Sequence, residues 1–68
     1  MNKYLLEYEI RRHHLTIAEI AKKIGMGRTT FWKKCNGHSE FKQSEIAALI
    51  KCLDLENPSE IFFADEVS

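Results

Sequence analysis

The sequence predicts an all-α domain built from five short helices. Apolar residues recur at spacings of three and four along the chain, and no segment of useful length alternates polar and apolar residues as a strand would. Capping residues and glycines divide these apolar patterns into short segments. A chain of 68 residues, 44% of them hydrophobic, can bury one modest core. We therefore expect residues 1–68 to form a single domain, with residues 64–68 as a flexible tail.

The first helix is expected over residues 3–13. Leu6 and Ile10 lie one turn apart in this segment and start its apolar stripe. Neighbouring side chains are expected to widen that stripe. These neighbours are Tyr4, Leu5 and Tyr8.

A capping box marks the start of the second helix. Thr16 is expected to cap the helix, and Glu19, three residues later, to return a hydrogen bond to the cap. The helix is expected to run to residue 24, where Gly25 follows as glycines do at helix C-termini. Its apolar face should comprise Ile17, Ile20, Ala21 and Ile24.

The remaining helices are placed by the same kinds of signal. The third is expected from residue 26 or 27 to about Asn36, with Gly37 closing it and a loop over residues 38–42. The fourth is expected over residues 43–53. Its buried row should be Ile46, Leu49, Ile50 and Leu53. A short fifth helix should begin with Asn57 as its cap and Pro58 at its first position. Its apolar surface should comprise Ile61, Phe62 and Phe63.

Residues 17–36 have the pattern of a helix-turn-helix unit, in which two short helices meet through a glycine turn. Ala21 supplies a small residue where the helices cross, and Gly25 tolerates a positive φ in the turn. Apolar side chains are expected to fill the space between the two helices. They are Ile20, Ile24, Met26 and Phe31.

The stretch LTIAEIAKKIGMGRTTFWKKCNG, residues 15–37, resembles the helix-turn-helix of lambda-repressor/Cro-like (XRE-type) DNA-binding domains. The matching positions are Leu15, Thr16, Glu19, Ile20, Ala21, Gly25, Asn36 and Gly37. The five-helix order extends the resemblance over nearly the whole chain, and TTFWKKCNG and SEFKQSEI are similar to small phage and prophage members. The resemblance implies a lambda-repressor-like domain, with the helix-turn-helix at its second and third helices. It also implies a sequence-specific transcriptional regulator, a repressor in a prophage switch, that binds a pseudo-palindromic operator as a homodimer.

The resemblance implies that the N-terminal end of the third helix enters the major groove. At 100° per residue, Thr29 and Lys33 point away from the buried Phe31. Gly27 allows close approach of the backbone, and Arg28 at the helix start can reach guanine O6 and N7. Lys33 can donate to a purine, and Thr29 can touch a base or a thymine methyl. The expected base contacts are therefore Gly27, Arg28, Thr29 and Lys33.

Contacts to the DNA backbone or the groove wall are expected around both ends of the unit. They are Thr16, Ile17, Trp32, Lys34, Asn36, His38 and Lys42. Ile17 occupies the position of a phosphate-contacting Gln in the family, so that contact stays open. Trp32 has two interpretations, packing on its own chain or stacking on a sugar or thymine methyl. For each Lys the alternative is a solvated basic patch.

The charge distribution leaves a second function open. The net charge is zero, but residues 1–43 hold nine Lys and Arg against four Asp and Glu, whereas residues 44–68 hold one Lys against six acids. The acidic third, with Phe62 and Phe63, suits a basic protein partner. The alternative function is therefore a protein-interaction module on the same fold, such as a modulator of a partner repressor or an antitoxin. Phe62 and Phe63 are also candidates for homodimer contacts, with at least one of them in the core. Pairing only on DNA is the other route to a dimer.

Other function classes are not expected. No nucleophile or acid–base pair converges on a pocket, so neither an enzyme nor a cofactor is expected. The spacing of His13, His14 and His38 does not fit a metal site. Cys35, which should be buried and inert, and Cys52 indicate reduced thiols in the cytoplasm of a bacterial or phage-infected cell. No apolar run approaches the length of a membrane span.

Overall fold

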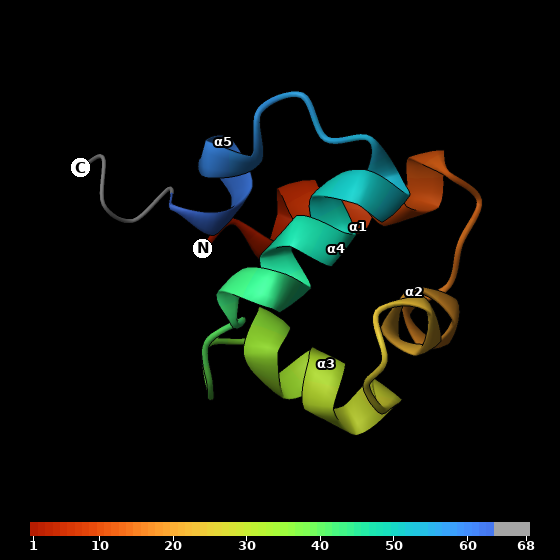
Figure 1. Cartoon of the computed structure of the whole chain (residues 1–68), viewed down its shortest axis with the longest axis vertical. Helices are drawn as coiled ribbons and strands as arrows, with labels where there is room; N and C mark the ends of the chain where they lie inside the picture. The colour runs from red at the N-terminus through yellow and green to blue at the C-terminus, as the bar shows by residue number, and fades with distance from the viewer. Residues whose placement is uncertain (64–68) are drawn as a thin grey trace.

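The computed structural model describes residues 1–63, which form five helices and no strand (Figure 1). The helices are α1 (Lys3–Arg12), α2 (Ile17–Lys23), α3 (Arg28–Cys35), α4 (Gln43–Leu53) and α5 (Pro58–Phe62). The all-α class and the order of helices are therefore confirmed for this part of the chain, with ends that differ by at most two residues from those expected. The expected tail, residues 64–68, lies outside the described residues.

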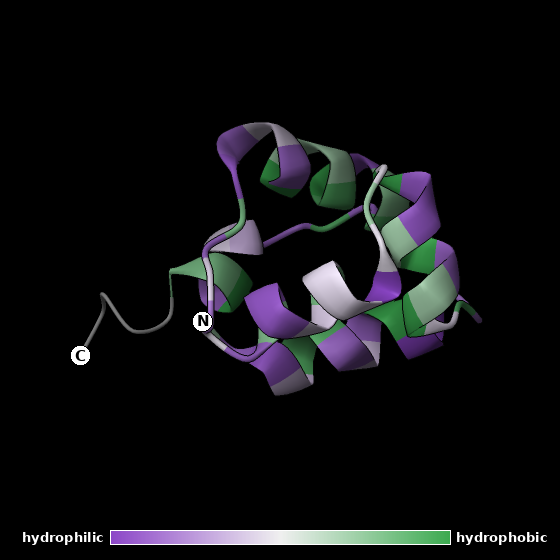
Figure 2. Ribbon diagram, turned by 90° about the horizontal axis from the view of Figure 1, so that it is seen from below, coloured by the Kyte–Doolittle hydropathy of each residue, from purple (hydrophilic) through white to green (hydrophobic). Residues whose placement is uncertain are grey.

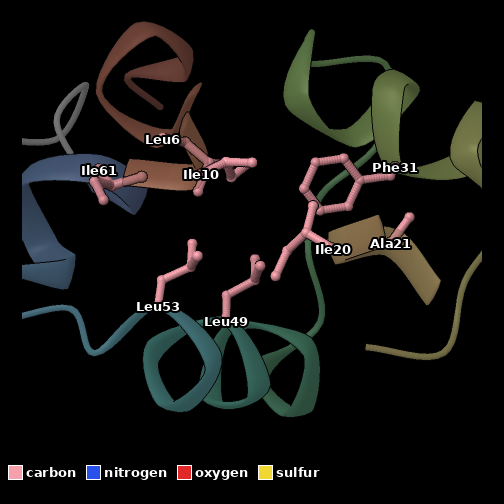
Figure 3. Packing of buried hydrophobic residues seen from close by; sticks show 8 residues of the cluster. All are labelled: Leu6, Ile10, Ile20, Ala21, Phe31, Leu49, Leu53 and Ile61. Atoms are coloured by element: carbon pink, nitrogen blue, oxygen red, sulfur yellow. The ribbon is translucent and has the colours of Figure 1, made fainter. Parts of the chain in front are cut away.

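All five helices contribute to one hydrophobic core (Figure 3). Its members are Leu6, Ile10, Ile20, Ala21, Phe31, Leu49, Leu53 and Ile61. Each of these residues is at most 2% exposed. Hydrophobic and hydrophilic segments alternate along the helical ribbons (Figure 2), as expected for helices that each bury one side. Because helices this short are marginal in water alone, their mutual burial is what stabilises them.

The helices pack in two recognisable pairs, α2 on α3 and α1 on α5. In Figure 1, α2 is seen nearly end-on while α3 lies across the lower part of the view, so these two helices cross steeply. The other pair is tied at the N-terminus, where the Asn2 backbone N–H donates to the Ile61 carbonyl at 2.7 Å. The α2–α3 pair therefore forms one side of the molecule, and α1 with α5 supports it through the core.

The first three helices end in the same way. The residue after each C-cap has a left-handed backbone, with φ of 58° at His14 and 82° at both Gly25 and Gly37. In α2 the Met26 N–H then donates to the Ala21 carbonyl at 2.9 Å, which satisfies one of the free carbonyls of the last turn. The two glycines were expected at these ends. His14 adopts the same conformation without being a glycine.

Two tyrosines contradict the expected apolar stripe of α1. Tyr4 is 72% exposed and Tyr8 is 58% exposed, whereas Leu6 and Ile10 are buried as expected. Residues two apart in a helix point to nearly opposite sides, so a tyrosine at either position cannot share the side of Leu6. The prediction that Tyr4 and Tyr8 widen the buried stripe was therefore wrong.

The expected buried row of α4 is half correct. Leu49 and Leu53 are fully buried, but Ile46 and Ile50 are only partly buried. Ile46 lies in the first turn, beside a surface cavity of about 370 Å³ that Phe62 also lines. The N-terminal end of α4 thus extends beyond the main core.

Candidate nucleic-acid interface

The reciprocal cap at the start of α2 forms as expected. The Thr16 hydroxyl accepts the Glu19 backbone N–H at 3.1 Å, and the Glu19 carboxylate accepts the Thr16 backbone N–H at 3.0 Å. Two donors that the helix cannot pair internally are satisfied in this way. Because the Glu19 carboxylate already occupies the Thr16 N–H, the hydroxyl hydrogen of the exposed Thr16 is the group left to face a ligand.

The turn between α2 and α3 depends on the conformation of Gly25. Its φ is 82°, and a Cβ built at this position would meet no atom within 4 Å. The requirement for glycine is therefore conformational and not steric. Ala21 on α2 and Phe31 on α3 are both 0% exposed, so the two helices are held together by apolar packing on either side of this turn.

The four residues expected to contact bases lie together at the start and on the outer side of α3. Gly27 is the N-cap, and a Cβ there would project into open space. Arg28, Thr29 and Lys33 are all exposed, whereas Phe31 is fully buried. The helix carries Arg28, Lys33 and Lys34 and no acidic residue. The core therefore leaves Arg28, Thr29 and Lys33 exposed as a basic surface on this helix.

Trp32 lies on the flank of this surface and is not part of the core. It is 54% exposed, and the imidazole of His38 stacks on its indole with 5.7 Å between ring centroids and 20° between ring planes. The packing partner of Trp32 is thus another exposed side chain. The sequence did not predict this contact, although both residues were expected near the groove wall.

Lys34, expected to contact a phosphate, is paired within the chain. Its Nζ lies 2.6 Å from Oε1 of Glu45, and the two side chains are 10% and 18% exposed. The same carboxylate oxygen accepts the Lys42 backbone N–H at 2.7 Å. These bonds lower the pKa of the Glu45 carboxyl, first through the side chain of Lys34 and then through the backbone of Lys42. Lys34 follows Phe31 by three residues on the same side of α3, and that spacing was the available signal.

Asn36 is also engaged within the chain. Its Oδ1 accepts a hydrogen bond from Lys3 Nζ at 2.9 Å, and its Nδ2 donates to the Trp32 carbonyl at 2.9 Å. The amide therefore closes the end of α3 and links it to α1. The phosphate contact expected of Asn36 from the sequence could therefore use only the second hydrogen of Nδ2.

The other residues expected to contact the DNA backbone or the groove wall differ in how exposed they are. Ile17 is partly buried and packs against the core, so it is mainly a packing residue. His38 and Lys42 are exposed at the C-terminal side of α3. The structure thus leaves Thr16, Trp32, His38 and Lys42 free to meet a ligand beside the basic surface. It engages Ile17, Lys34 and Asn36 in the fold.

Within residues 1–63 no three His, Cys, Asp or Glu side chains come together as a metal site would require. Cys35 is partly buried, and burial, followed by the nearby charge of Glu7, raises the pKa of its thiol to about 12. Among the described helices, none has the length and apolar character needed to cross a membrane.

Comparison with known proteins finds no family model, no curated protein and no solved structure that matches this chain.

Proposed function

We propose that this protein is a sequence-specific regulator of transcription that binds double-stranded DNA. The α2–α3 pair acts as a helix-turn-helix of the lambda-repressor/Cro-like kind, with α3 in the major groove. The observation that carries the proposal is the sidedness of α3. Arg28, Thr29 and Lys33 are exposed on a helix without acidic residues, while Phe31 anchors its other side in the core.

The chemistry of the exposed side suits base edges. Arg28 offers two parallel donors for O6 and N7 of a guanine, and Lys33 offers one donor for a purine acceptor. Thr29 lies one turn from Lys33 and can contact a base or a thymine methyl. A good bidentate contact contributes ~1–3 kcal/mol of discrimination against the wrong base pair. Open space around Gly27 lets the backbone approach the DNA closely.

Contacts to phosphates set the register of the helix in the groove. The proposal assigns them to the hydroxyl of Thr16 and to the exposed side chain of Lys42. Lys34 and Asn36 are left out because the fold already uses their polar atoms. This set is smaller than the one expected from the sequence, and it predicts a correspondingly shallower dependence of affinity on salt.

A short operator half-site cannot provide high affinity for one small domain. We infer that two copies bind a pseudo-palindrome whose half-sites lie one helical turn apart, ~34 Å. Phe63 is 44% exposed beside the cavity that Phe62 lines, which makes Phe63 the candidate for the contact between copies. Phe62 is less available, since it packs against the core and its ring meets that of Phe41.

A second function, binding a partner protein, is favoured by one observation. Tyr4 and Tyr8 lie one turn apart on α1 and are 72% and 58% exposed. Tyrosines exposed in this way are common in protein interfaces. On this alternative, the chain modulates a partner repressor or neutralises a toxin through α1.

A gel-shift titration separates the two functions. DNA flanking the protein's own gene is titrated with the full chain at two salt concentrations, with an unrelated duplex as competitor. The proposal expects binding that resists the competitor and weakens as salt rises, because phosphate contacts release counterions. Binding that is absent at both salt concentrations would reject the DNA-binding function and leave the partner-protein alternative.

A further inference from the structure

Thr29 and Lys33 form the outer row of α3, on the side away from the core. Trp32 lies beside this row and not within it. It follows Thr29 by three residues and precedes Asn36 by four, so it lies along the same edge of the helix. Relative to the buried Phe31, Trp32 points about 100° away and Thr29 about 160° away. When the outer row of a helix faces the base edges, the residues at the side of that row face the wall of the groove, because the major groove is about as wide as the helix. Trp32 would be such a residue.

The backbone turn after α3 returns His38 to the helix. The His38 backbone N–H donates to the Lys33 carbonyl at 2.9 Å, and Gly37 has the left-handed φ of 82° that this turn needs. The imidazole then stacks on Trp32. The hydrogen bonds that end the helix thus also place the backbone of His38, from which the imidazole reaches Trp32.

Trp32 keeps a polar donor free. Over residues 1–63 no hydrogen bond is formed by its indole N–H, although the neighbouring Asn36 amide bonds to the Trp32 carbonyl. An exposed indole combines a flat apolar surface with one donor at its edge. A sugar–phosphate strand presents matching groups, an apolar deoxyribose and a phosphate acceptor. The cations Arg28 and Lys33 on the same helix, with no acid among them, favour that polyanion over a neutral or acidic partner.

We propose that Trp32 and His38 form one contact unit that holds a single strand of the bound duplex at the groove wall. The indole packs on a deoxyribose and donates its N–H to a phosphate oxygen. His38 is a positioning residue that holds the indole at the required angle by stacking. This proposal rests on the proposed DNA-binding function and adds to it a contact that reads no base.

The single Trp of the chain provides a direct readout. A mixed-sequence duplex at low salt is titrated into the wild-type protein, and the indole emission is followed together with the anisotropy of a labelled duplex. The emission should change along the same binding curve as the anisotropy. Trp32→Phe keeps a ring but removes the N–H, and it should weaken binding about three- to tenfold, as loss of one hydrogen bond does.

Two variants of His38 show whether its ring stacking or its polar imidazole nitrogens support DNA binding. His38→Phe keeps an aromatic ring and should bind within about twofold of wild type, whereas His38→Ala should bind about as weakly as Trp32→Phe. Equal weakening by both His38 variants would overturn the positioning role. Tyr8→Phe is the matched control, because it removes a donor from an exposed aromatic on α1 and should leave binding unchanged. Circular dichroism of each variant verifies folding.

The outcomes distinguish the two proposals. If the wild-type protein does not bind duplex at low salt, the proposed function fails and this contact fails with it. If the wild-type protein binds but its emission stays constant and Trp32→Phe binds equally well, only the contact is overturned. A change of emission with single-stranded DNA, but not with duplex, would also overturn it, because that pattern indicates stacking on unpaired bases.

Discussion

The ammonium group of Lys34 lies 2.6 Å from the carboxylate of Glu45 and joins the last turn of α3 to the first turn of α4. The carboxylate also accepts the Lys42 backbone N–H, so a single oxygen both anchors α3 and caps α4. Because α3 carries the proposed base contacts, we expect this pair to position them without making one itself. Its consequences for stability and for DNA binding can be tested separately.

Replacing Lys34 by Met should destabilise the fold. The substitution keeps the apolar stem but leaves a poorly exposed carboxylate with one of its two donors removed. Hydrogen bonds to charged groups contribute roughly 1.5–3 kcal/mol when they are well shielded; partial exposure of this pair places the expected loss at about 1–2 kcal/mol. Urea denaturation followed by circular dichroism measures it. Lys33→Met, at the exposed neighbouring position, should change the free energy of unfolding by less than about 0.5 kcal/mol. Equal losses in the two variants would contradict a structural role for the pair.

The same carboxylate predicts an acid-sensitive contribution to stability. Its pKa is lowered in the folded protein, so the stabilisation is fully present above the unfolded pKa and is lost as pH falls through the folded pKa. The free energy of unfolding should therefore decline as pH drops below about 4.5, the ordinary value for this group. Other carboxyls titrate there too, so the measured quantity is the difference between wild type and Glu45→Gln. That difference should shrink with acidification, and a constant difference would exclude Glu45 as the source.

The turn at Gly25 offers a test of backbone conformation alone. Its φ of 82° is unfavourable for an L residue, while no atom lies within 4 Å of a Cβ placed there. Gly25→Ala should cost about 1–2 kcal/mol, the penalty of a left-handed L residue. D-alanine at the same position, introduced by chemical synthesis, should be neutral or stabilising because it restricts the unfolded chain. Thermal unfolding of the two variants, compared with wild type, measures these changes in stability. Similar losses from both isomers would point to a steric clash.

The two cysteines should differ in reactivity. Burial raises the pKa of the Cys35 thiol to about 12, so at neutral pH almost none of it is the reactive thiolate. Cys52 is exposed on α4. Iodoacetamide should therefore modify Cys52 in the native protein and Cys35 only after denaturation, as mass spectrometry of peptides would show. Modification of Cys35 at the rate of Cys52 under native conditions would contradict the burial of this helix end.

Arg28 is the sharpest test of base recognition. Arg28→Ala should weaken binding to the preferred operator by ~1–3 kcal/mol and relax the preference at one base pair. The matched control is Lys51→Ala, which removes an exposed cation from the last turn of α4. It should leave both affinity and preference unchanged. Gel shifts on operator variants measure both effects. A uniform loss on all sequences would make Arg28 a phosphate contact instead.

Lys34 should have no part in the salt dependence of DNA binding. Each phosphate contact contributes about 0.9 to the slope of log affinity against log salt. Lys42→Ala should reduce that slope by about one such step, since Lys42 is exposed. Lys34→Met should leave the slope unchanged, because Glu45 already neutralises the ammonium group. A reduced slope for Lys34→Met would show that DNA competes successfully with Glu45.

Much of the fold followed from local signals in the sequence. The Thr16–Glu19 box and the glycines at 25 and 37 marked helix ends correctly, because caps and left-handed turns depend on residues three to five apart. The burial of Phe31 and Ala21 also followed from helical spacing. The offset of Tyr4 and Tyr8 from Leu6 already argued for the opposite side of α1, and the prediction that they widen the buried stripe was wrong because it did not follow that spacing. The base-contacting function itself stays a prediction.

Contacts between different helices could not be predicted from the sequence. Lys34 and Asn36 were interpreted as phosphate contacts because a cation and an amide near a helix end usually face water. Their partners, Glu45 and Lys3, are 11 and 33 residues away along the chain. The stacking of His38 on Trp32 likewise depends on how the loop after α3 turns back.

The sequence by itself determined the order of the helices and, to within about two residues, where each begins and ends, because these features depend on neighbours within about one turn. Only the tertiary structure decided which polar side chains near α3 stay free. That choice depends on which charges the packing of α1 and α4 brings within hydrogen-bond distance. The surface left for a ligand is therefore what remains after the fold has used Lys34 and Asn36.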